Sequence, residues 1–243
     1  MLEPIKFLAW DSEFFHRQVG RLILKAGTPL DELLQSAYQQ RYELLYIYSP
    51  IPIKERLVSK YALLDVGGHI TFARDLSCQG FEAIKPEPEI HEYQLDVLTP
   101  ELLEIAFLSG HLSRFKVDSS LPAGSLESLY ETWLANTLEN RPTSSVYTYH
   151  SDDRVVGLIT SELHESKCNI GLLAVSQLHQ GQGIATKLIR YVQGICMTNN
   201  VASIEVKTQL SNKSARALYL KNSFLERERS FLYHAHSPGR LGI

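Results

Sequence analysis

The feature that most constrains this chain is the run Gln-Gly-Gln-Gly-Ile-Ala at residues 180–185, which lies between two contrasting patterns. Residues 169–175 form an apolar run as long as a buried strand, and apolar residues then recur at helical spacing from Ile184 to Val192. We therefore expect a strand that leads through a glycine-rich turn into a helix. Such a turn exposes unpaired backbone N–H groups at the positive end of the helix dipole. Phosphate or pyrophosphate is the expected ligand, because glycine allows it to approach the backbone closely. The alternative is an ordinary helix that begins with two glycines.

The composition indicates a soluble globular protein. Apolar residues make up 44% of the 243 residues, which is enough to fill a packed core. The formal charge of -3 lacks the basic excess typical of nucleic-acid-binding proteins. No apolar run approaches the roughly 18 residues of a membrane span, and charged residues interrupt the N-terminal segment where a signal peptide would lie. The cysteines Cys78, Cys168 and Cys196 form no paired motif, so we expect a reduced, cytoplasmic protein without nucleic-acid or membrane partners.

The first 85 residues alternate between strand and helix patterns. Strands are expected at residues 20–25, 44–48, 63–66 and 70–73, and helices at residues 30–40 and 53–61. The first helix is expected to begin with Thr28 as its cap and Pro29 in its first turn. Residues 82–89 are charged and contain two prolines, which suit neither a helix interior nor a central strand, so they are interpreted as a linker. The sequence thus predicts a smaller N-terminal α/β domain over residues 1–85.

Residues 90–243 are predicted to form a second domain with the element order β-α-α-β-β-β-α-β-α-β. Thr99 and Ser125 are expected to cap its first two helices. The expected strands lie at residues 93–98, 146–150, 155–163, 169–175, 203–208 and 228–234, and the helices at 100–112, 126–138, 184–198 and 212–224. Residues 237–243 are interpreted as a free tail. The fold class that follows is α/β with a mixed sheet.

Three segments of this second domain together resemble the acetyl-CoA site of the GCN5-related N-acetyltransferases. They are Leu-Ala-Val at residues 173–175, the glycine turn, and the pattern Asn212-x-x-Ala215-x-x-x-Tyr219-x-x-x-x-Phe224. The resemblance implies that acetyl-CoA is a co-substrate, that no metal is needed, and that the first strand splays from its neighbour. It also implies that the following residues bind the pantetheine and pyrophosphate: Leu173, Ala174, Val175, Gly181, Gln182, Gly183, Ile184, Ala185 and Thr186.

The same resemblance implies roles for Asn212 and Tyr219. Asn212 is expected near the pantetheine or the sulfur, although it would also cap the helix that it precedes. Tyr219 follows after two helical turns, on the same face, and is expected to protonate the departing CoA thiolate. A buried tyrosine that packs against Phe224 is the alternative. Lys187 would assist at the pyrophosphate.

A narrower resemblance, to acetyltransferases that act on nucleotide-linked amino sugars, involves residues along most of the chain. Its sequence pieces are Trp10, Phe14-Phe15, Ser113-Arg114-Phe115, Trp133, Gly171-Leu172-Leu173-Ala174 and Val206-x-Thr208-Gln209. It implies that the acceptor is the amine of a dTDP-linked dideoxy-aminohexose and that Arg114 and Phe115 bind it, with Arg114 in a loop. A surface salt bridge is the alternative role for Arg114. The assembly expected for such a protein includes a homodimer.

The general base is not identified by these patterns. Lys207 stands where some relatives carry a glutamate, and Glu162, His164 and Glu165 are polar residues close to the expected active-site strand. A water chain or an amine that arrives neutral would serve instead. His164 and Cys168 have a spacing compatible with metal binding, but no second pair accompanies them. Acetylation of a peptide or another small amine, and a degenerate acyl-CoA-binding regulator, are the alternative functions.

Overall fold

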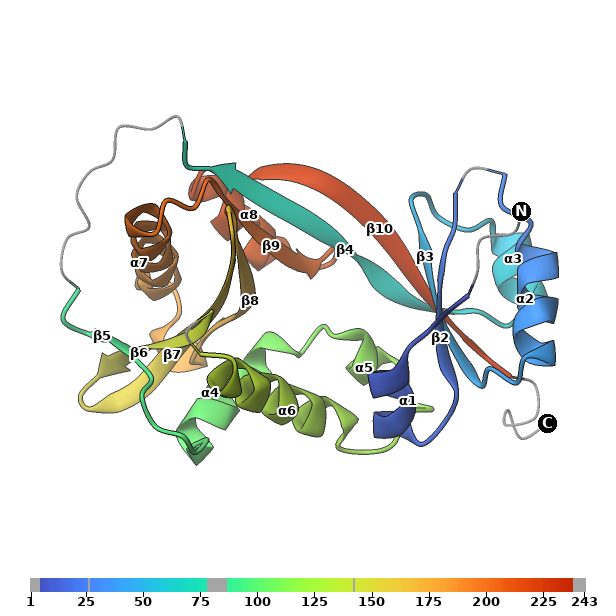
Figure 1. Ribbon diagram of the computed structural model, residues 1–243, viewed down its shortest axis with the longest axis horizontal. Coiled ribbons are helices and arrows are strands. Elements are labelled where there is room, and N and C mark those ends of the chain that lie inside the picture. The colour runs from blue at the N-terminus through green and yellow to red at the C-terminus, as the bar shows by residue number, and fades with distance from the viewer. Residues whose placement is uncertain (1–4, 26, 78–86, 142, 238–243) are drawn as a thin grey trace.

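The computed structural model describes residues 5–25, 27–77, 87–141 and 143–237, and it shows one ten-stranded mixed sheet with helices on both faces (Figure 1). The strands are β1 (Lys6–Phe7), β2 (Val19–Ile23), β3 (Leu44–Ser49), β4 (Leu64–Asp75), β5 (Ile90–Glu92), β6 (Ser144–Ser151), β7 (Arg154–His164), β8 (Lys167–Val175), β9 (Ser203–Gln209) and β10 (Leu225–His236). The α-helices are α1 (Ala9–Phe15), α2 (Leu30–Gln39), α3 (Glu55–Lys60), α4 (Pro100–Ser109), α5 (Arg114–Val117), α6 (Ser125–Glu139), α7 (Ile184–Thr198) and α8 (Lys213–Lys221). A 3-10 turn, η1 (Gln177–His179), precedes α7.

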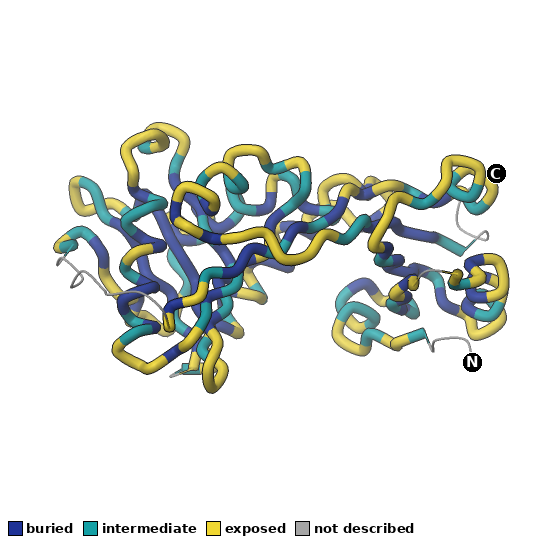
Figure 2. The backbone as a smooth tube through the Cα atoms, turned by 90° about the horizontal axis from the view of Figure 1, so that it is seen from above, coloured by how far each residue is buried: buried dark blue, intermediate teal, exposed yellow. Residues whose placement is uncertain are grey.

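The sheet runs in the order β1-β2-β3-β10-β4-β9-β8-β7-β6-β5, and its two ends form two lobes. The long strands β4 and β10 pass from one lobe to the other (Figure 1). β10 pairs with β4 along most of its length and with β3 from Phe231 to His236, both antiparallel. Figure 2 shows the narrow connection that these strands make between the lobes. The C-terminal strand therefore completes the lobe built from the first part of the chain. The division into domains at residues 1–85 and 90–243 stays a prediction, and residues 82–86 of the predicted linker lie outside the described residues.

The strands β8 and β9 are parallel neighbours that separate partway along their length. They pair from Lys167 with Ser203 to Ile170 with Val206, and no pairing follows. β8 continues for five residues beyond this point and β9 for three. Both strands therefore carry free backbone groups on facing edges at the centre of the larger lobe.

Helices cover the two faces of this part of the sheet with separate cores. α7 packs on one face, where Leu188, Val192 and Ile204 belong to the largest apolar cluster. α4 and α6 cover the other face, where Leu102, Leu134 and Leu172 are buried together. In the smaller lobe α2 packs its apolar side into a third cluster. Burial of large apolar side chains on both faces holds the separated strands in place.

Two of the predicted strands are a single strand in the structure. Residues 63–66 and 70–73 both belong to β4, which continues through Gly67 and Gly68. Gly67 has a φ of 92°, and a side chain on Gly68 would collide with the backbone of Ser230 in β10. The two glycines, which are typical of a turn, are used here to bring two strands close together.

Other local predictions need correction. Residues 93–98 are not a strand, because β5 ends at Glu92 and the Tyr93 hydroxyl donates to the Val97 carbonyl as the chain turns toward α4. Thr28 does not cap α2, since its hydroxyl accepts from the backbone N–H of Lys25. Ser125 lies inside α6, and Gly124 with a φ of 79° occupies the cap position. The cap at Thr99 is confirmed, with its hydroxyl accepting from the N–H of Leu102.

The described residues contain no helix with the length and hydropathy that a membrane crossing requires. Cys168 and Cys196 are free and buried, while Cys78 lies outside the described residues. The predicted tail beyond Ser237 is also outside them.

Candidate functional site

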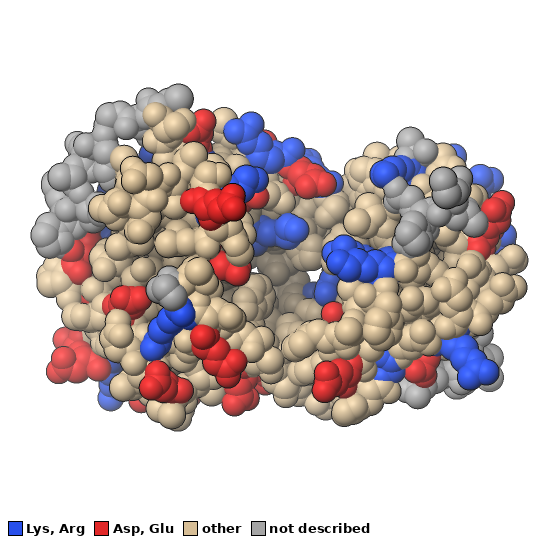
Figure 3. Space-filling model, viewed as in Figure 1, with Lys and Arg blue, Asp and Glu red and all other residues tan. Residues whose placement is uncertain are grey.

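A cleft of about 1540 Å³ passes through the sheet where β8 and β9 separate and opens between the two lobes. The space-filling view shows the molecule hollowed at this place, with basic side chains gathered around the hollow (Figure 3). Of the predicted site residues, the cleft lining includes Leu173, Ala174, Val175, Gly181, Gly183, Ile184, Ala185, Thr186, Asn212, Tyr219, Arg114 and Phe115. Gln182 does not line it. The structure thus brings residues from the donor and acceptor predictions into one continuous space.

A bulge shapes β8 at the point where it leaves β9. The register with β7 shifts between Ile159 and Ser161, and the Thr160 hydroxyl accepts from the backbone N–H of Leu172 at 2.8 Å. The bulge changes which face each side chain takes: Ile170 belongs to the core under α7, whereas Leu172 belongs to the core under α4 and α6. The hydrogen bond to Thr160 also directs the Leu172 N–H toward β7. The edge of β8 that faces the gap is therefore left for a ligand.

The glycine turn has the backbone that the sequence predicts for it. Gly181 and Gly183 have φ values of 78° and 83°, a conformation that favours glycine, and Gly183 is the N-cap of α7. The Gln180 side-chain amide donates to the Val175 carbonyl at 3.0 Å and ties the turn to the end of β8. Gln182 turns its amide back to the Leu178 carbonyl, 3.4 Å away. A fifteen-residue helix therefore presents its N-terminal N–H groups to the cleft, an arrangement that suits an anion.

Lys187, expected to assist at the turn, has other partners. Its Nζ lies 2.8 Å from a carboxylate oxygen of Glu87 and 3.4 Å from the Tyr149 hydroxyl. Because Glu87 neutralises the charge of Lys187, the positive potential at the turn comes mainly from backbone dipoles.

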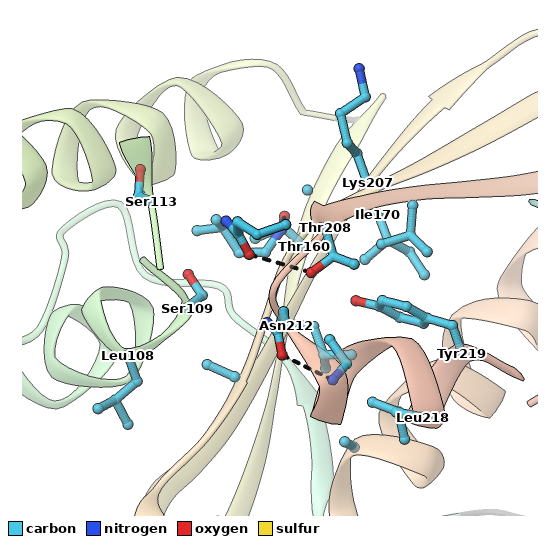
Figure 4. A pocket seen from close by; sticks show the side chains of 18 of the residues that line it. Leu108, Ser109, Ser113, Thr160, Ile170, Lys207, Thr208, Asn212, Leu218 and Tyr219 are labelled. Atoms are coloured by element: carbon cyan, nitrogen blue, oxygen red, sulfur yellow. Dashed lines mark hydrogen bonds between the residues drawn. The ribbon is translucent and has the colours of Figure 1, made fainter. Parts of the chain in front are cut away.

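Asn212 and Tyr219 approach the cleft from α8 (Figure 4). The Asn212 side chain accepts from the N–H of Ala215 at 3.0 Å, so its predicted capping role is confirmed. The Tyr219 hydroxyl points toward the separation of the strands, near Ile170 and Thr208 (Figure 4). Its ring packs between Phe72 and Phe224, with centroid distances of 5.6 and 5.8 Å. Both the packing role and the approach to the gap are therefore present in one side chain.

Burial governs the ionisation of Tyr219. The side chain is only 4% exposed, and the desolvation raises its pKa above the ordinary phenol value. The phenol is thus protonated at neutral pH and able to donate a proton to an anion formed in the gap.

The opposite side of the sheet carries a different set of side chains. His69 and Thr71 of β4 lie directly opposite Gln209 and Lys207 of β9, and all four line the cleft. Their neighbours in sequence, such as Phe72, face the core that contains Tyr219. The two faces of the sheet therefore meet only through the gap between β8 and β9.

Arg114 stands at this second side and begins the short helix α5, so the predicted loop is helical at this point. Its Nη1 donates to the Tyr48 hydroxyl at 2.7 Å, and its guanidinium lies 4.1 Å from the Tyr46 ring centroid and 4.6 Å from that of Phe115. Among the described residues no carboxylate lies within 4.0 Å of it, so the alternative of a surface salt bridge is not supported. The buried Nε atom also has no partner in the described chain.

His69 is a cleft residue that the sequence patterns did not single out. Burial, together with the charges of Arg114 and Lys207, lowers its pKa to about 4. Its Nδ1 is buried and has no hydrogen-bond partner among the described residues. A neutral imidazole therefore faces the space beside β9. His69 can be recognised as a cleft residue only from the fold, because its partner Gln209 in β9 lies 140 residues away in sequence.

A buried cluster next to Arg114 was also missed. The Asp118 carboxylate accepts hydrogen bonds from His234 Nδ1 at 2.5 Å, His236 Nε2 at 2.9 Å and the Ser120 hydroxyl at 2.6 Å. Burial alone would raise the pKa of Asp118, but these hydrogen bonds hold it below its usual range. Burial lowers the pKa of His234 to about 4. Asp118, His234 and His236 have the geometry of a metal-binding group and are joined by hydrogen bonds, while the buried His234 Nε2 has no partner among the described residues. The cluster fixes the segment after α5 to β10.

The charged residues near the expected position of a base lie in two places: Lys207 is on this second side, and Glu162 and His164 are at the end of a hairpin. Glu162 lines the cleft and its carboxylate is 3.2 Å from His164 Nε2, at an exposed end of the hairpin. The Lys207 side chain points away from Tyr219 (Figure 4). Two of the carboxylates that line the cleft are paired with other side chains, Glu162 with His164 and Glu205 with Lys167.

Comparisons with known proteins agree with this geometry. Residues 112–224 match the sequence model of the acetyltransferase (GNAT) family. No match is found among curated proteins. A GCN5-related N-acetyltransferase from Sphaerobacter thermophilus superposes with a TM-score of 0.53 at 18% identity, over 85% of this chain and 65% of that one.

Two further structures share the fold. A tandem GNAT protein from the clavulanic acid biosynthesis pathway superposes with a TM-score of 0.53 at 12% identity, over 90% of this chain and 75% of that one. A conserved protein of unknown function from Staphylococcus epidermidis has a TM-score of 0.58 at 9% identity, over 91% and 84%. The matched segment contains the glycine turn and the helix of Tyr219. The solved structures show that the chain has the GNAT acetyltransferase fold, and the match of residues 112–224 to the family model indicates an acetyl-CoA-dependent N-acetyltransferase.

Proposed function

We propose that the protein transfers the acetyl group to the amine of a nucleotide-linked amino-dideoxy sugar, a dTDP-linked dideoxy-aminohexose. The residues that resemble TDP-fucosamine acetyltransferase (dTDP-4-amino-4,6-dideoxygalactose acyltransferase) are scattered along the sequence. The observation that carries the proposal is that Arg114, Phe115, Trp133, Gly171 and Thr208 nevertheless line one cleft.

Acetyl-CoA enters from the side of α7 and α8 in this proposal. The N–H groups at Gly181 to Thr186 hold the pyrophosphate, and the free edge of β8 at residues 173–175 pairs with the pantetheine. This places the thioester in the gap between β8 and β9. A backbone N–H of β8 aimed at the thioester oxygen stabilises the negative charge that develops there, which is worth about 2.7–4 kcal/mol in comparable sites.

The acceptor enters from the side of Arg114 and His69. Its amine nitrogen attacks the thioester carbonyl carbon, the N–C bond forms, and the C–S bond breaks. Tyr219 donates its proton to the departing sulfur, because it approaches the gap from the donor side as a neutral phenol. Both substrates are held in contact, so no covalent enzyme intermediate is needed.

The amine must lose a proton in this reaction. Of the carboxylates that line the cleft, Glu162 is paired with His164 and Glu205 with Lys167, which supports an amine that arrives neutral or loses its proton through water. His69 offers a neutral imidazole on the acceptor side, and its low pKa makes it a hydrogen-bond acceptor and only a weak base. The N-terminal part of the chain contributes Tyr48 from β3 and His69 and Thr71 from β4 to this wall. Both parts of the chain therefore form the acceptor site.

A screen of amines with purified protein and acetyl-CoA, followed by the release of CoA thiol, tests the proposal. The amines are dTDP- and UDP-linked amino sugars, their free amino sugars, and short peptides with a free N-terminus. We expect turnover with a dTDP-linked amino sugar at a kcat/KM well above that of the free sugar. Turnover confined to peptides or simple amines would contradict the proposal. CoA binding without any turnover would favour the regulatory alternative.

A further inference from the structure

The chain has only two tryptophans, and both line a second, smaller cavity of about 290 Å³. Trp10 comes from α1 in the smaller lobe and Trp133 from α6 in the larger one. Each is 42% exposed, although tryptophan normally buries most of its surface. Two indoles from distant parts of the chain thus leave ring surface accessible at the same small space.

The cavity wall combines ring surface with polar groups. Besides Trp10 and Trp133 it contains Asp11, Asn136, Arg114, Phe115 and Leu129. Trp10 is stacked on Phe14 with centroids 5.0 Å apart, which holds its ring from behind. A carboxylate and a carboxamide offer acceptors and donors at the edge of the space. Flat apolar walls with a few polar groups at the rim suit a planar heterocycle.

The small cavity continues into the main cleft. Arg114, Phe115, Leu129, Trp133 and Asn136 line both spaces. The six-membered ring of Trp133 lies against Gly171, close enough that a Cβ there would be 3.2 Å from Trp133 Cζ2. Trp133 therefore separates the small cavity from the start of the gap in β8. A ligand that reaches around this ring passes Arg114.

We propose that the cavity between Trp10 and Trp133 binds the base of a pyrimidine nucleoside diphosphate, with the diphosphate at Arg114 and the attached sugar in the main cleft. This inference rests on the proposed function and identifies how the nucleotide part is recognised. The cavity volume of about 290 Å³ lies just below the range of ligand pockets, about 300–1,000 Å³, so the cavity suits one ring rather than a whole substrate. The guanidinium of Arg114 is free of carboxylates in the described chain and binds phosphate oxygens in a fork.

Intrinsic tryptophan fluorescence reports directly on this site, because both fluorophores line it. Thymidine, dTDP and inorganic pyrophosphate are titrated into the full chain in separate experiments, with calorimetry as a second measurement. We expect thymidine and dTDP to quench the fluorescence and pyrophosphate alone not to. Trp10→Phe and Trp133→Phe each leave one reporter, and both should still be quenched if the base lies between the rings.

Alanine variants measure the contribution of stacking. Trp10→Ala and Trp133→Ala should each weaken dTDP binding by about tenfold or more, in line with the loss of one base–aromatic contact. Trp10→Ala should leave acetyl-CoA binding unchanged. Phe7→Ala removes an aromatic residue that is 50% exposed on β1 outside the cavity, and it should leave dTDP binding unchanged. If an alanine variant fails to fold, the phenylalanine variants still test quenching.

The outcomes separate this inference from the proposed function. If dTDP-linked amino sugars are acetylated but neither tryptophan variant changes the dTDP affinity or the KM, the base binds elsewhere and the inference is wrong. If dTDP binds and quenches the tryptophans but no nucleotide-linked amine is acetylated, the site stands and the proposed acceptor is wrong. If neither thymidine nor dTDP binds, the inference is overturned.

Discussion

The proposed donor and acceptor sides of the cleft are built in different ways. The donor side comes from two contiguous segments, β8 with the turn to α7, and β9 with the turn to α8. The acceptor side combines single side chains from many elements, among them Tyr48, His69, Arg114 and Trp133. A contiguous segment folds its ligand-binding backbone locally, whereas a scattered set depends on how distant elements pack. In the proposed function, cofactor binding is therefore a property of local backbone, and the choice of acceptor is a property of tertiary packing.

The largest expected effect lies where the two sides meet. Tyr219→Phe should lower turnover by about 10²–10⁴-fold, the usual contribution of general acid catalysis, because the departing thiolate loses its proton donor. Acetyl-CoA affinity should change by only a few-fold, since the ring and its packing are kept. Stopped-flow turnover and calorimetric binding provide the two measurements. Turnover within a factor of two of the unsubstituted protein would assign Tyr219 to the core alone.

Acetyl-CoA binding should weaken when a side chain covers the backbone of the glycine turn. Gly183→Val should weaken acetyl-CoA binding by about 100-fold, because it removes one or two hydrogen bonds to a charged phosphate at about 1.5–3 kcal/mol each. Gly124→Val is the matched control, since Gly124 caps α6 with a φ of 79° and no atom lies within 4 Å of its Cβ position. Both variants carry similar backbone strain, so equal affinity in the two would show that the turn does not hold the phosphate.

Substitutions on the acceptor side should change the kinetics of the acceptor without changing acetyl-CoA affinity. Arg114→Ala should raise the KM of the nucleotide-linked acceptor by about tenfold and leave acetyl-CoA affinity unchanged, because it removes charged hydrogen bonds on one side only. Tyr48→Phe deletes the hydroxyl that holds Arg114 and should give a smaller change of the same kind. A fall in acetyl-CoA affinity would place Arg114 with the cofactor and remove the distinction between the two sides.

The smallest effect concerns stability near the acceptor side. Burial lowers the pKa of His69 and His234 to about 4, so between pH 6.5 and 4 the unfolded chain binds more protons than the folded one. The free energy of unfolding should therefore fall as pH drops through this window, by at most about 1.4 kcal/mol per pH unit for each group. Urea unfolding at several pH values measures the slope.

Two variants assign that slope to its source. His234→Gln should flatten it, and His164→Gln, at an exposed ring, should not. Asp118 acts in the same direction at lower pH. A carboxylate whose pKa is lowered in the folded protein stabilises the fold at pH values above its pKa in the unfolded chain. This contribution is lost as the pH falls through the folded pKa. An unchanged slope in His234→Gln would show that the buried histidines do not govern acid stability.

The same contrast explains which parts of the structure could be predicted from the sequence. The turn at Gly181 and Gly183, the cap at Thr99 and the hairpin of β6 and β7 follow from neighbouring residues, and all are present. Residue pairs distant in sequence were not foreseen, such as Asp118 with His234. Gly67 and Gly68 were misinterpreted because their use as a contact surface depends on β10, which follows more than 150 residues later. Tertiary contacts of this kind leave no periodic signal in the sequence.

The placement of β10 has a consequence for synthesis on the ribosome. β3 and β4 flank β10 in the sheet and pair with it rather than with each other. Because the chain emerges from the ribosome N-terminus first, the inner edges of β3 and β4 cannot form their hydrogen bonds until residues 225–236 have been made. The nascent smaller lobe is therefore an incomplete sheet for most of translation. Its exposed edges would be the natural place for a chaperone to act, and for aggregation to begin if elongation stalled before the last strand.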